Sequence, residues 1–231
     1  MCNETPPLLD LMKQYRDFYS PQELCRLSGE QRKHYSDLLA HVKNVNSSKC
    51  SDRIKGAALE ELVAYLLQIS GGIFKVLKNV RTSTNEIDQL VTLNENGRPF
   101  LGLQLISPRL GNFMGECKNY SGAVDVTYVG KFYSLLLTTG INTGILFTYH
   151  GVTGTGWTNG NGLIKKAYLQ RELDEHRVAI IVFSVTDYER IQNGENFISL
   201  VEEKLFALKT DTDISQYISS HEAEMVFLGQ A

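Results

Sequence analysis

Cysteine, net positive charge and long apolar runs are all scarce in this sequence of 231 residues. The four cysteines lie far apart and form no C-x-x-C pair, which argues against a disulfide framework and a zinc site. The longest stretch without a charged residue, 132–164, is interrupted by glycine, threonine and asparagine, so no membrane-spanning helix is expected. The N-terminus has neither the basic nor the apolar region of a secretion signal. We therefore expect a cytoplasmic protein with reduced thiols and no membrane partner.

Charge is distributed unevenly along the chain, although the net charge is only -3. Residues 1–166 carry 18 Lys and Arg against 14 Asp and Glu, whereas residues 167–231 carry 5 against 12. A polyanionic partner is expected to contact the first part of the chain, with the acidic last third turned away. Acidic, solvated helix faces would explain the same imbalance without any partner.

Two regions are expected from the pattern of helix signals. Residues 1–50 predict an N-terminal helical appendage, which contains a capping-box signal at Ser20–Glu23. A polar run, Asn44–Lys49, separates it from a helix predicted over 51–70, which Gly71-Gly72 ends. Residues 51–231 then predict one further domain, in which short β-rich runs alternate with helices.

The predicted domain has the element order of an α/β fold. Val129, Phe132, Leu136 and neighbouring apolar residues recur at helical spacing, which predicts a helix buried on one face. Further helices are predicted over 163–175 and 197–208. The predicted strands are Phe74–Val80, Ile87–Leu93, Phe100–Ile106, Phe113–Lys118, Thr143–Tyr149 and Val178–Ser184. This order favours a central mixed β-sheet flanked by helices on both faces.

An acid and a base share one face of the predicted strand that ends at Lys118. In Gly115-Glu116-Cys117-Lys118 the alternation of a strand sends Glu116 and Lys118 to the same face and Cys117 to the other. Charged groups in an apolar region are costly unless they pair with each other or serve a metal and a polyanion. A plain ion pair is the simpler of these two interpretations.

A second acid, Asp88, enters a predicted strand next to strongly apolar positions. Mg²⁺ prefers oxygen ligands, and two carboxylates with a backbone carbonyl are a typical protein contribution. Asp88, Glu116 and the main-chain carbonyl of Cys117 could supply that set. Glu86 lies on the same face as Asp88 but is better explained as a solvated acid.

A third acid lies on the helix predicted over 51–70. Glu60 aligns with Val63, Ala64 and Leu67, an apolar row, whereas Glu61 aligns with more polar positions. Glu60 is therefore the candidate that points inward. An ordinary carboxylate on the helix surface is the equally supported alternative.

The order of these motifs resembles the PD-(D/E)xK, or restriction-endonuclease-like, nuclease superfamily, and most closely its Mrr-type restriction endonucleases. The resemblance covers about Lys55 to Gly156 and includes the Gly56-x-x-x-Glu60 helix, Asn85-Glu86-Ile87-Asp88 and Glu116-Cys117-Lys118. It implies that Asp88 and Glu116 bind metal, that Lys118 assists the attacking water and that Glu60 is an auxiliary acid. Lys131, on the helix after the last motif, is the candidate for a further basic residue near the site.

The resemblance implies a Mg²⁺-dependent DNA endonuclease, with Mn²⁺ as an alternative metal, in a host-defence or type IV-like restriction system. Duplex DNA is the expected substrate, and a homodimer is expected because one site per chain must act on two strands. Accessory defence proteins are further candidate partners. Two other interpretations stay open: a Holliday-junction or repair-type nuclease, and a non-catalytic nucleic-acid-binding or interaction subunit on the same scaffold.

Overall fold

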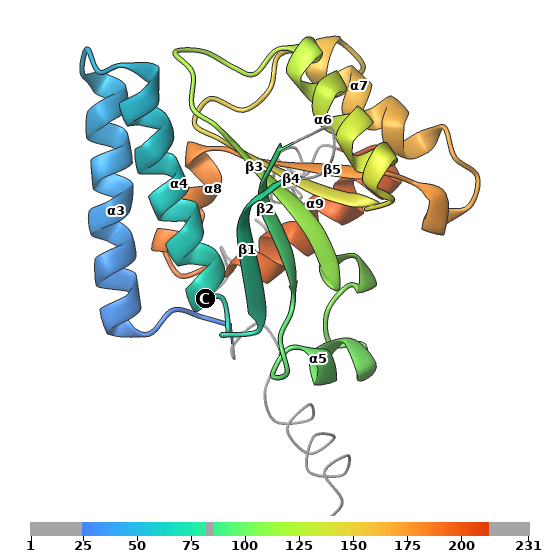
Figure 1. Cartoon of the computed structure of the whole chain (residues 1–231), viewed down its shortest axis with the longest axis horizontal. Coiled ribbons are helices and arrows are strands. Elements are labelled where there is room, and N and C mark those ends of the chain that lie inside the picture. The colour runs from blue at the N-terminus through green and yellow to red at the C-terminus, as the bar shows by residue number, and fades with distance from the viewer. Residues whose placement is uncertain (1–24, 82–85, 213–231) are drawn as a thin grey trace, which may run out of the picture.

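The computed structural model describes residues 25–81 and 86–212, which form a five-stranded mixed sheet between two layers of helices (Figure 1). The strands lie in chain order across the sheet: β1 (Phe74–Arg81), β2 (Glu86–Leu93), β3 (Asn112–Lys118), β4 (Thr143–Thr148) and β5 (Ala179–Phe183). The pairs β1–β2 and β2–β3 are antiparallel, whereas β3–β4 and β4–β5 are parallel. The predicted α/β class with a mixed, helix-flanked sheet is therefore confirmed.

Two crossover helices, α6 (Val126–Thr139) and α7 (Asn159–Leu169), cover one face of the parallel strands. Both lie on the same face, as expected when successive parallel connections have the same hand. Every residue of β4 is buried, because helices cover this strand on both sides. A Cβ at Gly144 would lie only 2.6 Å from the Phe132 ring, so glycine lets α6 pack closely onto β4.

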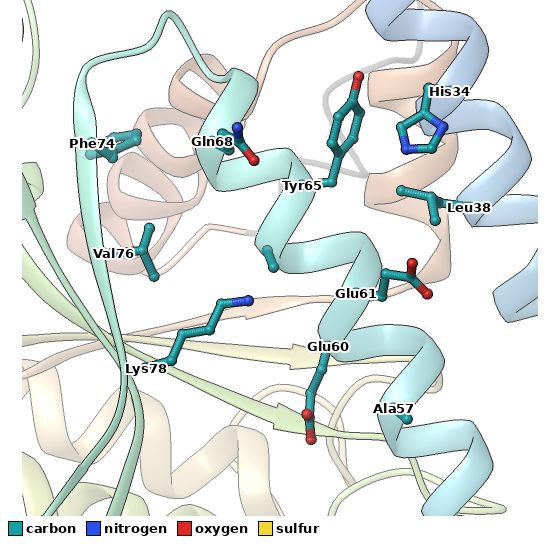
Figure 2. A pocket seen from close by; sticks show the side chains of 11 residues that line it. His34, Leu38, Ala57, Glu60, Glu61, Tyr65, Gln68, Phe74, Val76 and Lys78 are labelled. Carbon is teal, nitrogen blue, oxygen red and sulfur yellow. The ribbon is translucent and has the colours of Figure 1, made fainter.

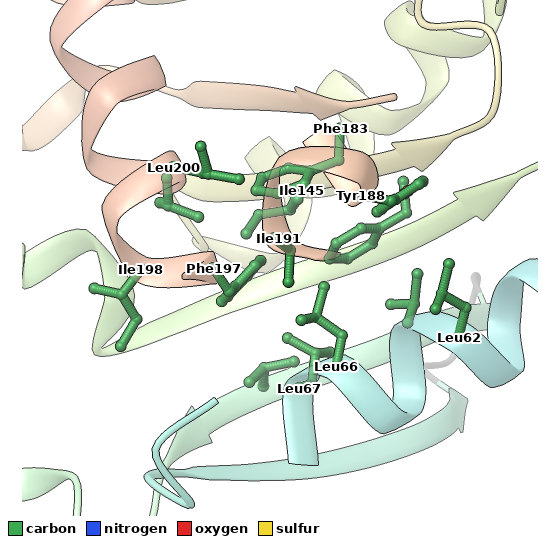
Figure 3. Close-up of a cluster of buried hydrophobic side chains, with 14 of the residues drawn as sticks. Leu62, Leu66, Leu67, Ile145, Phe183, Tyr188, Ile191, Phe197, Ile198 and Leu200 are labelled. Carbon is green, nitrogen blue, oxygen red and sulfur yellow. The ribbon is translucent and has the colours of Figure 1, made fainter. Parts of the chain in front are cut away.

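The opposite face of the sheet packs against three helices, α4 (Asp52–Ile69), α8 (Val185–Gln192) and α9 (Phe197–Thr210). The helix α3 (Gly29–Ser47) packs on α4 and α8. Figure 3 shows side chains of α4, α8 and α9 meeting in a single apolar cluster. Phe183 and Phe197 lie at its centre, with ring centroids 5.3 Å apart. This cluster is the larger of the two cores and fixes α4 against β3 and β4.

The helix α3 belongs to this larger core. Ser28 begins it with a complete capping box, since Ser28 and Gln31 each accept a hydrogen bond from the other's backbone N–H. Tyr35 and Val42 on its inner face are fully buried. The helix start predicted at Ser20 lies outside the described residues. None of the helices in the described ranges is long and apolar enough to cross a membrane.

The strand predicted over Phe100–Ile106 is wrong. The segment forms the short helix α5 (Arg98–Gly102) followed by a turn, and the 3₁₀ helix η1 (Pro108–Leu110) precedes β3. Pro99 lies in the first turn of α5, where its fixed φ and missing N–H favour helix initiation. The Asn94 side chain accepts hydrogen bonds from two backbone N–H groups, those of Asn96 and Gly97, and so closes the turn before the helix.

Two further differences concern helices. The helix predicted over 163–175 begins earlier, at Asn159, and ends at Leu169, followed by the 3₁₀ helix η2 (Asp174–His176). The helix α8 was not predicted, although Ser184 and Asp187 form a capping box at its start. Its 8 residues are too few for a clear helical repeat.

Candidate active site

Antiparallel pairing of β2 with β3 brings Asp88 next to Glu116. Gln89 lies opposite Gly115 and Leu90 opposite Met114, so the same register continued by one residue sets Asp88 beside Glu116. The backbone N–H of Cys117 donates to Asp88 Oδ2 over 3.3 Å. Two acids 28 positions apart in the sequence thus occupy adjacent strands at one end of the sheet.

Lys118 lies between these two carboxylates. Its Nζ is 2.6 Å from Glu116 Oε1 and 3.9 Å from Asp88 Oδ2. Glu116 and Lys118 share one face of β3, as the alternation of the strand predicted. The Glu116 side chain is 16% exposed and that of Lys118 is 24% exposed, so the pair is only partly accessible to solvent.

The electrostatics of the group follow from partial burial. Burial raises the pKa of Glu116, and the charge of Asp88 raises it further, against the lowering effect of Lys118. Burial alone would lower the pKa of Lys118, but the hydrogen bond to Glu116 and the charges of both acids outweigh it and raise that pKa. In this arrangement Lys118 therefore places a positive charge beside the two acids.

Glu60 lies on α4 within electrostatic reach of Cys117, the residue between Glu116 and Lys118. Its charge acts with those of Asp88 and Glu116 to raise the pKa of the buried Cys117 thiol, for which burial itself is the largest cause. The Glu60 side chain is exposed, because the buried row of α4 runs through Ala58, Leu59 and Leu62 instead. Figure 2 shows Glu60 and Glu61 leaving α4 in different directions, with Glu61 toward α3.

Lys131 does not reach the other candidates. It is exposed on α6, and among the described residues its ammonium contacts the ring of Tyr128, at 5.1 Å from the centroid. The Tyr128 ring lies 5.2 Å from that of Tyr120, which is close enough to Lys118 to affect its pKa. Lys131 thus contacts one of a pair of tyrosines near Lys118, and among the described residues it forms no ion pair with the carboxylates.

Two residues that the sequence analysis did not single out join α4 to β3 at the site. Asn119, directly after Lys118, is buried, and its Nδ2 donates to the main-chain oxygen of Lys55 over 2.8 Å. Lys55 is also buried, in the first turn of α4. No sequence pattern identifies this contact, because it joins positions 64 apart.

The donor set at the site suits a hard divalent cation. Asp88 and Glu116 contribute carboxylate oxygens from adjacent strands, and the raised pKa of Glu116 reflects a negative charge with little solvation. The described residues include no group of three or more His, Cys, Asp or Glu side chains that could hold a metal ion. A Mg²⁺ ion held here would therefore depend on two carboxylates, a main-chain carbonyl and water.

A comparison with known families finds a match for the segment that contains Asp88, Glu116 and Lys118. Residues 51–164 match the family model Mrr_cat, described as a restriction endonuclease. This segment belongs to the Mrr_cat restriction endonuclease family. The match is to a restriction endonuclease catalytic domain, which implies a nuclease with DNA as substrate. No curated protein matched the chain.

The Mrr_cat segment begins just before α4 and ends within α7. It contains every candidate site residue, from Glu60 to Lys131. The elements α3, β5, α8 and α9 lie outside it, although they pack against it in one core. Features built by those elements therefore lie outside the matched family segment.

Proposed function

We propose that this chain is a Mg²⁺-dependent DNA endonuclease that hydrolyses phosphodiester bonds, acting as a host-defence or type IV-like restriction enzyme. The observation that carries the proposal is the group formed by Glu116, Lys118 and Asp88 at one end of the sheet. Its place in an Mrr_cat segment supports nuclease chemistry over an ordinary ion pair. Mn²⁺ is the alternative metal.

Each residue has a role that its surroundings support. Asp88, Glu116 and the Cys117 carbonyl would hold the cation, which when bound neutralises phosphate charge and acidifies a coordinated water. Lys118, whose ammonium lies beside both acids, would stabilise the negative charge that accumulates on the phosphorus oxygens. Glu60 would act as an auxiliary acid, and Lys131 would contact the DNA backbone farther from the reacting atoms. The expected products carry a 5′-phosphate and a 3′-hydroxyl.

A cleavage assay tests the proposal. Plasmid and linear duplex are incubated with Mg²⁺, with Mn²⁺ and with chelator, and the wild type is compared with Asp88→Ala and Lys118→Ala. We expect cutting only with metal, and a loss of about 10²-fold or more in both variants. Asp37→Ala, which changes an exposed acid on α3, is the matched control and should cut normally. Cutting that persists in chelator would exclude the metal-dependent mechanism.

The same assay separates the rival functions. Cutting of a four-way junction but not of linear duplex would favour a Holliday-junction or repair-type nuclease. Binding of DNA without any cutting would favour a non-catalytic subunit, or one that needs an accessory defence protein. Binding should weaken as salt rises, because contacts with phosphate release counterions.

We further propose that residues 51–231 form the nuclease domain and that residues 1–50 are an appendage whose α3 completes the core. A homodimer would place two sites across the duplex, one for each strand. Sedimentation of the free protein and of the DNA complex tests this, since a monomer in both would exclude the dimer.

A further inference from the structure

A groove with a volume of about 630 Å³ lies between α3, α4 and β1 (Figure 2). Glu60 lines it, whereas Asp88, Glu116 and Lys118, here called the acid–lysine group, do not. This volume is within the range of small-ligand sites. His34 from α3, Tyr65 and Gln68 from α4, and Lys78 from β1 are among the residues that line it. The groove has aromatic, amide, carboxylate and ammonium groups but no role in the chemistry proposed above.

Two aromatic residues form one end of the groove in a fixed arrangement. The rings of His34 and Tyr65 meet edge to face, with centroids 4.5 Å apart and an interplanar angle of 87°. The Tyr65 hydroxyl donates to the main-chain oxygen of Gln31 over 3.5 Å, which ties this ring to α3. A planar ligand could stack here without a large loss of side-chain freedom.

The charged groups of the groove favour a neutral ligand that donates hydrogen bonds. Glu60 and Glu61 both line it, so a phosphate placed inside would face two carboxylates. Glu61 and the carbonyl oxygen of Gln68 are acceptors, and Lys78 is a donor that enters from the opposite wall. This set matches the edge of a nucleobase with an exocyclic amino group.

The groove and the candidate active site meet along α4. Glu60 lines the groove, and it lies on α4 shortly after Lys55, whose main-chain oxygen accepts the hydrogen bond from Asn119 at the end of β3, next to Lys118. A nucleotide next to the phosphate held near Asp88 and Glu116 could therefore place its base in the groove. One wall comes from α3, outside the Mrr_cat segment, so the groove is a feature of this chain.

We propose that this groove binds the unstacked base of a nucleotide flanking the scissile phosphate, and that it selects adenine, cytosine or guanine over thymine. The inference rests on the proposed function, because it requires a nucleic acid bound at the acid–lysine group. The base stacks on the Tyr65 and His34 end, and its amino group donates to Glu61. Through this groove α3 contributes to the choice of cutting site.

Sequencing of cut ends tests the proposal. A library of random-sequence duplexes is digested with Mg²⁺, and the bases on both sides of each cut are counted. We expect the wild type to disfavour thymine at one flanking position by about three- to tenfold, as for a single hydrogen-bonded base edge. Glu61→Gln should reduce that preference, since an amide can also donate to thymine, and His34→Ala should reduce it by weakening the stacking.

The controls are His41→Ala and Asp37→Asn, exposed positions on α3 that do not line the groove. Both should keep the wild-type preference. Metal-dependent cutting with equal base counts at every flanking position would overturn the groove assignment and leave the nuclease proposal intact. No cutting of the library with any metal would remove the nuclease proposal and the groove assignment together.

A binding experiment without cutting gives an independent measurement. 2-Aminopurine is placed at the preferred position of a labelled duplex, and wild-type protein is added without divalent metal. Anisotropy reports binding, and the fluorescence of 2-aminopurine reports unstacking of that base. We expect the fluorescence to change in the wild type and in His41→Ala, and to change less in Glu61→Gln. Full binding with unchanged fluorescence would contradict the proposal.

Discussion

The Nδ2 atom of Asn119 lies 2.8 Å from the main-chain oxygen of Lys55, and this hydrogen bond joins β3 to α4 at the candidate active site. One partner directly follows Lys118, and the other lies in the first turn of the helix that carries Glu60. The bond is buried, so water cannot replace it. It therefore fixes the spacing between the strand with the acid–lysine pair and the helix with the auxiliary acid.

Asn119→Asp should lower the free energy of unfolding by about 2–3 kcal/mol, because a buried carboxylate can neither donate to Lys55 nor find solvent. Asn119→Ala removes the bond without adding a charge and should cost about 1–2 kcal/mol. Urea unfolding measures both values. Wild-type stability in both variants would show that this hydrogen bond is not what position 119 supplies. Cleavage at saturating DNA should fall in both, since Glu60 loses its fixed position.

In the proposed mechanism Lys118 would compete with a cation for Glu116 and Asp88, because its ammonium lies within 2.6 and 3.9 Å of them. Lys118→Met should lower the melting temperature without metal, since two neighbouring carboxylates then lack their partner. Added Mg²⁺ or Mn²⁺ should raise the melting temperature of this variant more than that of the wild type. Calorimetry with a metal titration measures the difference.

The matched control for that titration is Asp88→Asn, which removes one proposed metal ligand and keeps the lysine. Its melting temperature should respond least to metal. An equal response of Lys118→Met, Asp88→Asn and the wild type would argue that the carboxylates do not bind the cation. The result is independent of cleavage, so it tests the site even if the substrate is unknown.

Local sequence patterns were enough to predict the parts of the site that lie on one strand. Alternation along β3 predicted that Glu116 and Lys118 share a face, and they lie 2.6 Å apart. The apolar surroundings of Asp88 predicted its strand but not its partner, because pairing between strands is a tertiary property. The family resemblance supplied that pairing by analogy rather than by physical argument.

Other features could not be read from the sequence because they depend on packing between distant segments. Glu60 lies beside apolar residues in the helical repeat yet is exposed, since the buried row of α4 is rotated away from it. The groove needs His34 and Tyr65 from two helices that a polar run separates. The strand predicted over 100–106 was wrong for a local reason. Its apolar composition suggested a strand, whereas Pro99 lies in the first turn of a short helix.

Arg190, on α8, forms ion pairs with two carboxylates, one in the segment that follows α8 and one on α9. It contacts Glu195 over 2.7 Å and Glu203 over 2.6 Å. The hydrogen bond from Arg190 lowers the pKa of Glu203, so this contribution to stability exists above the unfolded pKa of a glutamate and disappears as pH falls through the lowered value. Arg190→Met should cost about 1 kcal/mol near pH 7, since the group is partly exposed.

The stability difference between the wild type and Arg190→Met should therefore shrink as pH is lowered below about 4, where glutamates protonate. Urea unfolding at a series of pH values gives this difference. Arg98→Met, an exposed change on α5, should show no such dependence. A difference that stayed constant down to low pH would show that the arginine acts through packing rather than charge. Cleavage near neutral pH should be unchanged, because the candidate active site lies elsewhere.

Tyr35 couples α3 to α8, because its buried hydroxyl donates to the main-chain oxygen of Tyr188 over 3.1 Å. Tyr35→Phe keeps the ring and removes the bond, so we expect a loss of about 1–2 kcal/mol in the free energy of unfolding. Tyr133→Phe, on a half-buried face of α6, is the control and should change stability by less.

If α3 shares one core with the nuclease domain, Tyr35→Phe should lower the temperature of a single cooperative transition. A separate early transition, with the rest of the chain unaffected, would instead identify α3 as an independent unit.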